Sequence, residues 1–259
     1  MQPQLIFFDF DDTLYSHTTK GVSRSTRDAL IELQSRGHTI VIATGRGPAS
    51  MPFIQEQLAV PCDTMVFLNG QLIFRKSQKI FERFITLPSM DRMIERVRSC
   101  GFAYGGHYEY GEIVDHMNER VEKVWHDFNN KLPKVLNRFE RRHPLYQAHL
   151  YITKEEANDV QEYLNDYVIN WSHEYLVNMI SKEAGKSQAV RWLLKEADIP
   201  KECSFAFGDG FNDVDMLLSV GHGVAMGNAS DALKEVAELV TGSADEDGIR
   251  QALTSYGLI

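Results

Sequence analysis

The chain has 259 residues, 43% of them hydrophobic and 24% charged, which is ordinary for a folded globular protein and excludes a disordered or fibrous one. This length is enough for one large domain or two smaller ones. The 27 basic and 36 acidic residues leave a formal net charge of −9, so we expect no nucleic-acid partner, because proteins that bind nucleic acids non-specifically are usually basic.

Short apolar runs alternate with helical patterns at the start of the chain. Residues 5–8, 39–43 and 65–68 are runs that are typical of buried strands. Residues 25–36 carry apolar side chains at helical spacing between the first two runs, and a second helix is predicted over residues 49–58. Strands that alternate with helices in this way predict a parallel sheet with helices on its faces.

The pattern changes between about residues 85 and 182. The elements predicted there are a helix at 89–100, a hairpin around 105–111, a helix from 118, a strand at 148–152, a helix at 155–164 and strands at 168–171 and 175–179. This mixture is typical of an α+β domain.

After residue 186 the alternation of strands and helices returns, with a helix at 189–196 and strands at 204–207 and 223–225. We therefore predict an α/β core made of residues 1–84 and 183–259, with an α+β domain of residues 85–182 inserted into it.

The apolar runs are too short to cross a membrane, and residues 1–4 do not resemble the start of a secretory signal. We therefore expect no membrane association and a cytoplasmic location. The three cysteines, Cys62, Cys100 and Cys203, lack the spacing of a metal or redox site. In that compartment we expect them to be buried, reduced thiols.

Polar side chains follow the predicted strands of the core. Asp9 and Asp11 come directly after the first apolar run, Thr44 follows the second, and Asp209 and Asp213 follow the run at 204–207. The carboxyl ends of parallel strands form the ligand-binding edge of an open sheet, so these side chains are expected to converge. Several carboxylates in one place repel one another unless a cation is bound, and Mg²⁺ prefers oxygen ligands. The pattern therefore predicts a Mg²⁺ site.

The spacing of Asp9 and Asp11 suits phosphoryl transfer. One carboxylate can attack phosphorus while the other acts first as an acid and then as a base. The Thr44 hydroxyl can donate to a phosphoryl oxygen, and a lysine is needed to balance the charge. Lys182 and Lys186 are both candidates, and the expected start of the helix favours Lys186.

These residues resemble the four motifs of the haloacid dehalogenase (HAD) superfamily of phosphatases. The matching segments are Asp9-Phe10-Asp11-Asp12-Thr13-Leu14, Thr44-Gly45-Arg46, Lys186 and Gly208-Asp209-Gly210-Phe211-Asn212-Asp213. More narrowly, Asn69-Gly70, Val224-Ala225-Met226-Gly227-Asn228-Ala229 and Glu246-Asp247-Gly248 resemble the Cof-type subfamily. The resemblance implies a Rossmann-like parallel-sheet core with an inserted α+β cap. The chain departs from the pattern at Asp12, where the subfamily often has glycine, and at Ser187, where glycine usually follows the lysine.

The resemblance also implies the roles of the core residues. Asp9 would be the nucleophile that forms an aspartyl-phosphate and also a Mg²⁺ ligand. Asp11 would be the general acid/base, with its backbone carbonyl on the metal, and Asp209 would be the third metal ligand. Thr44 and Lys186 would be catalytic residues that hold the phosphoryl group.

Further residues would support the metal or contact the substrate. Asn212 and Asp213 would stabilise the metal site without binding the metal themselves. The substrate-binding set implied by the resemblance is Thr44, Gly45, Arg46, Asn69, Lys186 and Asn212.

Substrate choice would come from the cap. The candidate specificity residues there are His107, Tyr108 and His116. The basic cluster of Arg138, Arg141 and Arg142 could attract a phosphate or simply form a solvated helix face.

The resemblance predicts a Mg²⁺-dependent phosphatase, a monomer or homodimer, that acts on small phosphorylated metabolites such as sugar phosphates or phosphorylated cofactors. Two alternatives remain open. One is a phosphomutase of the same superfamily, and the other is a catalytically inactive relative that binds metabolites.

Overall fold

A computed structural model describes residues 3–109, 111–128, 131–137, 139 and 143–259. Its internal contacts divide the chain into two compact units. The core unit comprises Met1–Arg46, Ser50–Glu82 and Lys186–Ile259, and the cap unit comprises Gly47–Ala49 and Arg83–Gly185.

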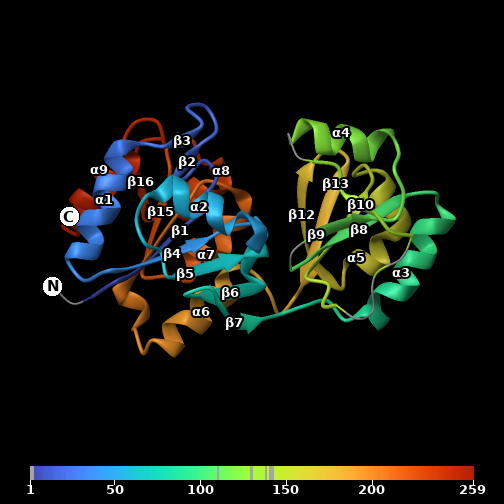
Figure 1. The fold of residues 1–259 in the computed structure, drawn as a ribbon, viewed down its shortest axis with the longest axis horizontal. Helices are drawn as coiled ribbons and strands as arrows, with labels where there is room; N and C mark the ends of the chain where they lie inside the picture. Colours follow the sequence, from blue (N-terminus) through green and yellow to red (C-terminus); the bar gives the residue numbers. More distant parts are fainter. Residues whose placement is uncertain (1–2, 110, 129–130, 138, 140–142) are drawn as a thin grey trace. The chain divides into compact units, whose positions relative to one another are not determined.

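The core unit is built on a sheet that has eight strands in the described part of the chain (Figure 1). From edge to edge these are β16 (Leu239–Val240), β15 (His222–Ala225), β14 (Ser204–Gly208), β1 (Leu5–Phe8), β4 (Thr39–Ala43), β5 (Thr64–Phe67), β6 (Leu72–Arg75) and β7 (Gln78–Glu82). The strands from β16 to β5 pair in parallel, and this confirms the predicted parallel sheet. The antiparallel strands β6 and β7 at the edge are absent from the sequence prediction.

The chain enters this sheet near its middle and extends it in both directions. From β1 it proceeds to β4 and β5 on one side, and from β14 to β15 and β16 on the other. The strand order therefore reverses between β1 and β14, which is where open α/β sheets bind ligands.

Helices pack against the core sheet. Side chains of α6 (Lys186–Glu196), α7 (Val214–Leu218) and α8 (Asp231–Val236) share one apolar cluster with Phe7 and Val41 of the sheet. Elsewhere α1 (Arg24–Ser35) packs against β4 and α9 (Gly248–Ser255), and α2 (Met51–Leu58) precedes β5. The sheet and its helices together hold the carboxyl ends of the central strands in fixed positions.

The cap unit contains a sheet of six strands among its described residues. Their order is β10 (Lys134–Val135), β9 (Gly111–Val114), β8 (Ala103–Tyr108), β11 (Gln147–Tyr151), β13 (Leu176–Ser181) and β12 (Tyr167–His173). The predicted hairpin around residues 105–111 is β8 and β9. The predicted helix over 155–164 is a 3₁₀ segment, Glu156–Val160, followed by one α-helical turn, α5 (Gln161–Leu164).

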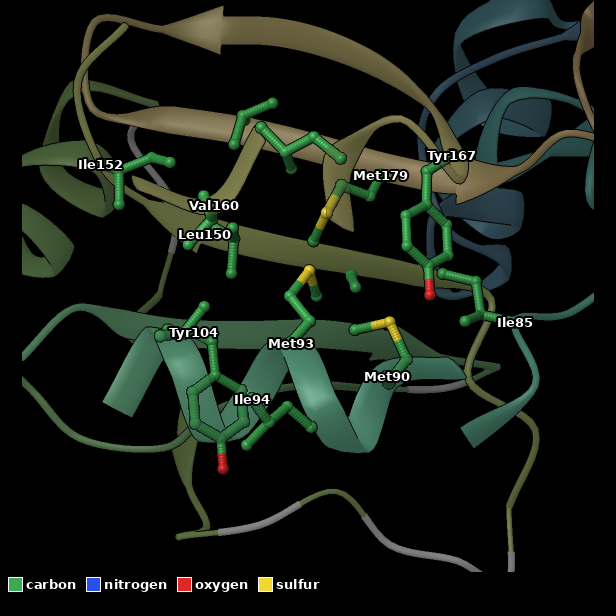
Figure 2. Close-up of a cluster of buried hydrophobic side chains, with 14 of the residues drawn as sticks. Ile85, Met90, Met93, Ile94, Tyr104, Leu150, Ile152, Val160, Tyr167 and Met179 are labelled. Carbon is green, nitrogen blue, oxygen red and sulfur yellow. The ribbon is translucent and has the colours of Figure 1, made fainter. Parts of the chain in front are cut away.

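The two faces of the cap sheet are covered differently. On one face, Met90 and Met93 of α3 (Leu87–Ser99) pack toward Leu150 and Met179 of the strands (Figure 2). On the other, α4 (Glu119–Asp127) covers one end of the sheet, where Trp125 belongs to a small apolar cluster. The strands therefore have one face that packs against α3 through apolar side chains and one face that α4 covers only in part.

Two further sequence predictions can be compared with the structure. In the part of the chain that is described, no helix is both long and apolar enough to cross a membrane. The cysteines are free thiols, but only Cys62 is buried, because Cys100 and Cys203 lie at element ends that are partly exposed.

Candidate active site

Three adjacent strands of the core sheet carry the predicted site residues at their carboxyl ends. Asp9 directly follows β1, Thr44 follows β4, and Asp209 follows β14. Because β14, β1 and β4 are neighbours, these side chains share one edge of the sheet, as the strand pattern predicts.

A buried lysine joins two carboxylates at this edge. The Nζ atom of Lys186, the first residue of α6, donates to Asp9 Oδ1 at 2.5 Å and to Asp213 Oδ1 at 2.6 Å. Burial by itself would lower the pKa of Lys186, but the carboxylates of Asp213 and Asp9 raise that pKa above its usual value. The lysine that reaches Asp9 is thus Lys186, whereas Lys182 belongs to the cap unit.

Asp213 is fully buried and uses both of its carboxylate oxygens. Its Oδ2 accepts the backbone N–H groups of Asp209 at 3.1 Å and Gly210 at 3.0 Å, while Oδ1 faces Lys186. A Cβ at Gly208 would lie 2.6 Å from the Asp213 Cβ, so glycine is required where β14 ends. Asp213 therefore fixes the position of both Asp209 and Lys186.

Asp9, Asp209 and Asp213 form an acidic cluster. One carboxylate oxygen from each lies within 4.8 Å of the other two. Burial raises the pKa of Asp209 to about 7, against a hydrogen bond from Thr13 that lowers it. Burial also raises the pKa of Asp9 well above its usual range, and the carboxylates of Asp213 and Asp209 add to this despite Lys186.

The raised pKa values of Asp9 and Asp209 mean that the Lys186 ammonium alone does not balance the charge of the three carboxylates. All three side chains offer oxygen, which is the donor that hard divalent cations prefer. Asp213 already accepts hydrogen bonds at both oxygens, and Asp209 Oδ1 accepts from the Thr13 hydroxyl at 2.7 Å. The remaining oxygens of Asp9 and Asp209 therefore fit a divalent cation best.

Asp11 makes a different set of contacts. Arg46 donates to both of its carboxylate oxygens, from Nε at 2.8 Å and from Nη2 at 2.6 Å, and His17 Nε2 lies 3.0 Å from Oδ1. The Arg46 guanidinium also lies 5.1 Å from the ring centre of Phe53 and 5.3 Å from that of Phe10. From the sequence, Arg46 was expected to contact the substrate, and no role was assigned to His17. No local sequence pattern indicates that either side chain contacts Asp11.

The departure from glycine at Asp12 has a structural explanation. Asp12 has a φ of 54°, in the left-handed region that aspartate enters more readily than most residues. Its carbonyl accepts from Asn228 Nδ2 at 2.8 Å, and its Oδ1 accepts the backbone N–H of His17 at 3.1 Å. These bonds hold the turn between Asp11 and the hairpin of β2 (Tyr15–Ser16) and β3 (Gly21–Val22).

The loops after β4 and β5 bring the remaining core candidates together. Asn69, with a φ of 55°, donates its backbone N–H to the Thr44 carbonyl at 3.0 Å and accepts from Asn212 Nδ2 at 3.0 Å. The Asn69 side chain also lies against Gly45, where a Cβ would be 3.3 Å from its Oδ1. Thr44 Oγ1 accepts the Arg46 backbone N–H at 3.0 Å, which leaves its hydroxyl hydrogen available.

The cap candidates lie in the other unit. His107 pairs with Glu112 through Nε2, and Tyr108 packs partly against the apolar cluster of the cap. His116 is exposed, and its Nδ1 lies 2.9 Å from Asp115 Oδ2. The cluster of Arg138, Arg141 and Arg142 falls outside the described residues.

Comparisons with known proteins agree with the fold and the motifs. The family model of the haloacid dehalogenase-like hydrolases matches residues 6–253. The chain is 30% identical to YkrA of Bacillus subtilis strain 168 over 100% of both chains. It is 27% identical to the 5-amino-6-(5-phospho-D-ribitylamino)uracil phosphatase YitU of the same strain, over 98% of each chain.

Among solved structures, the HAD subclass IIB sugar phosphatase BT4131 matches with a TM-score of 0.86 and 29% identity, over 99% of this chain and 100% of that one. The resemblance noted in the sequence is confirmed. The chain belongs to the haloacid dehalogenase-like hydrolases.

Proposed function

We propose that this haloacid dehalogenase-like hydrolase is a Mg²⁺-dependent phosphatase of small phosphorylated metabolites and that Asp9 forms an aspartyl-phosphate intermediate. The observation that carries the proposal is the buried Asp9 carboxylate, which contacts the Lys186 ammonium and lies in a cluster with Asp209 and Asp213. Two similar proteins support this substrate class. YitU is named as a phosphatase of a phosphorylated ribitylamino-uracil, and BT4131 is named as a sugar phosphatase.

The residues that would hold the cation are Asp9 and Asp209 through their side chains and Asp11 through its backbone carbonyl. A bound divalent cation would screen the repulsion between the Asp9 carboxylate and the phosphoryl oxygens. Asp213 would keep Asp209 in place through the two backbone N–H groups that it accepts.

In the first half of the reaction an Asp9 oxygen attacks phosphorus, and the bond from phosphorus to the ester oxygen breaks. A lysine ammonium has three donors, and two of those on Lys186 are used by Asp9 and Asp213, so one remains for a phosphoryl oxygen. The Thr44 hydroxyl donates to another phosphoryl oxygen. Asp11 gives a proton to the departing alcohol.

In the second half, water attacks phosphorus while the Asp11 carboxylate takes its proton. The bond from phosphorus to Asp9 breaks, which restores the free carboxylate and releases phosphate. Arg46 donates to both Asp11 oxygens and so fixes the orientation of this carboxyl group. Arg46 therefore acts on the reaction by positioning Asp11.

The proposal is tested by phosphate release from p-nitrophenyl phosphate with Mg²⁺, with EDTA and with variants of the full chain. We expect EDTA to stop release, and Asp9→Asn to lower kcat by at least about a thousandfold, because loss of a nucleophile removes the covalent route. The matched control is Asp28→Asn on the exposed side of α1, which should keep the wild-type rate. Full activity of Asp9→Asn, or of the wild type in EDTA, would contradict the proposal.

A further inference from the structure

A surface cavity of the core unit lies between α6 and the end of α7. It has a volume of about 290 Å³, and its lining residues are Arg191 and Leu194 of α6, Lys201 of the 3₁₀ turn Lys201–Cys203, and Leu218 and Ser219 at the end of α7. We call it the α6–α7 cavity. All of its lining residues belong to the core unit, and none is among the candidates for the active site.

Two cations line the α6–α7 cavity without an acidic partner. Within the described part of the chain, neither Arg191 nor Lys201 forms an ion pair, and both donate to uncharged oxygens. Arg191 donates to Ser219 Oγ at 3.0 Å and to Ser187 Oγ at 3.2 Å. Lys201 Nζ donates to the Leu218 carbonyl at 3.0 Å. In a chain with a net charge of −9, this cavity is therefore a locally positive site.

Most donors of the two cations have no acceptor in the protein. A guanidinium has five N–H donors and an ammonium has three. Arg191 uses two of its donors on the two serine hydroxyls, and Lys201 uses one on a carbonyl, within the residues that the structure describes. The remaining donors of both side chains can bind the oxygens of an anion in the cavity.

The walls of the α6–α7 cavity fix the positions of the two cations. Ser219, which accepts from Arg191, is only 8% exposed. The backbone of Lys201 is held by the Ser204 hydroxyl, which donates to its carbonyl at 2.6 Å. A Cβ at Gly221 would lie 2.6 Å from the same carbonyl, so the close approach of this turn requires glycine. Cations that are positioned in advance lose less conformational freedom when they bind a ligand.

Charge and surface chemistry together favour a phosphate group as the ligand. Arg191 and Lys201 carry two positive charges, and a phosphate monoester carries about −1.5 to −2 near pH 7. A carboxylate would balance only one of the two cations, and the planar guanidinium suits the oxygens of phosphate. Leu218 is 54% exposed beside these cations, so it can be covered by an apolar part of the same ligand.

We propose that the α6–α7 cavity is a second phosphate-binding site, in which Arg191 and Lys201 bind a phosphate dianion. The dianion can be the phosphate group of a small ester, whose organic part then contacts Leu218, or it can be free inorganic phosphate. The proposal does not rest on the phosphatase function, because it uses none of the residues proposed for that reaction.

The test measures binding to the full chain by calorimetry in EDTA at low ionic strength. Without a bound cation the acidic cluster repels anions, so binding at the active site is disfavoured. The probes are inorganic phosphate and phenylphosphonate, whose carbon–phosphorus bond replaces the ester bond. Arg191→Gln and Lys201→Gln each remove one cation, and the matched control Lys195→Gln removes an exposed cation from α6. Leu218→Ala is paired with Ile31→Ala, because Ile31 is 52% exposed on α1.

We expect the wild type and Lys195→Gln to bind phenylphosphonate equally. Arg191→Gln and Lys201→Gln should each lower the affinity by at least about tenfold, since each removes charge-assisted hydrogen bonds. If the natural ligand is an ester, Leu218→Ala weakens phenylphosphonate binding by about threefold or more, and inorganic phosphate binds as before. If it is inorganic phosphate, the wild type binds both probes equally, and Leu218→Ala behaves as Ile31→Ala.

The proposal is overturned if the wild type binds neither probe. It is also overturned if Arg191→Gln or Lys201→Gln binds both probes as tightly as Lys195→Gln does. Lys201→Gln keeps the hydrogen bonds between Arg191 and the two serines, so it tests the proposal even if Arg191→Gln folds poorly. Its melting temperature should match that of the wild type, because the side chain of Lys201 is exposed.

Discussion

Replacing Lys186 by methionine removes the cation from the middle of the acidic cluster while nearly keeping the volume of the side chain. The lysine side chain is 0% exposed, and its two partners, the carboxylates of Asp9 and Asp213, are 9% and 1% exposed. In the metal-free variant these carboxylates face Asp209 with no positive charge between them. We expect the folded state to lose stability for this reason.

The size of the loss follows from two limits. Removing one partner of a buried ion pair costs about 3–5 kcal/mol. The carboxylates can reduce this cost by binding protons, since each unit by which folding raises a pKa is worth about 1.4 kcal/mol. A carboxyl group whose pKa is raised by folding makes the folded state less stable at pH values above the unfolded pKa of about 4. This loss of stability grows with pH until the pKa of the folded state is reached. We therefore expect a loss of about 3–5 kcal/mol near pH 8, and less than half of it near pH 5.

The measurement is urea unfolding followed by circular dichroism, in EDTA, at both pH values. The control is Lys195→Met, which replaces an exposed lysine of the same helix. Added Mg²⁺ should restore part of the stability of Lys186→Met, because the cation supplies the missing charge. If Lys186→Met is as stable as Lys195→Met in EDTA at both pH values, the cluster does not have the charge balance described above.

Two further predictions concern the acid/base groups. The pKa of Asp209 is about 7, so Mg²⁺ must displace a proton from this carboxyl group at lower pH. The affinity for Mg²⁺ should therefore fall by up to about tenfold for each pH unit below that pKa. Calorimetry that finds no pH dependence of the affinity would contradict this prediction. Arg46→Lys keeps the charge but cannot donate to both Asp11 oxygens in one plane, so kcat should fall by about 10–100-fold with little change in KM. Steady-state kinetics beside Arg24→Lys, an exposed control, measure the effect, and an unchanged kcat would exclude a positioning role.

The centre of the core sheet could be predicted from the sequence because its strands are buried on both faces. Leu5–Phe8 and Thr64–Phe67 are buried at every position, and all of these residues except Thr64 are apolar, so each strand is marked in the sequence by a short apolar run. Strand β7, at the edge of the sheet, mixes polar, charged and apolar residues, and the turn that joins it to β6 has positive φ at both Lys76 and Ser77 without a glycine. No local signal marks such a hairpin.

The site could be predicted only as far as backbone geometry determines it. Asp9 and Asp209 meet because β1 and β14 are neighbours, and the alternation of strands and helices predicts that both residues lie at the carboxyl edge of one parallel sheet. The contact of Arg46 with Asp11 depends on how a long side chain packs among aromatic rings, which spacing does not reveal. In β11, Gln147 and His149 alternate with apolar residues as in any half-exposed strand, yet both are buried.

The central claim is that Asp9 becomes phosphorylated during turnover. The most direct measurement is an acid quench in the steady state with p-nitrophenyl phosphate, followed by borohydride reduction of acyl phosphates and mass spectrometry of the peptides. We predict that reduction converts Asp9, and neither Asp11 nor Asp209, to homoserine, and that EDTA abolishes the conversion. Homoserine at Asp11 or Asp209, or an unmodified Asp9 in protein quenched while it is releasing phosphate, would contradict the account.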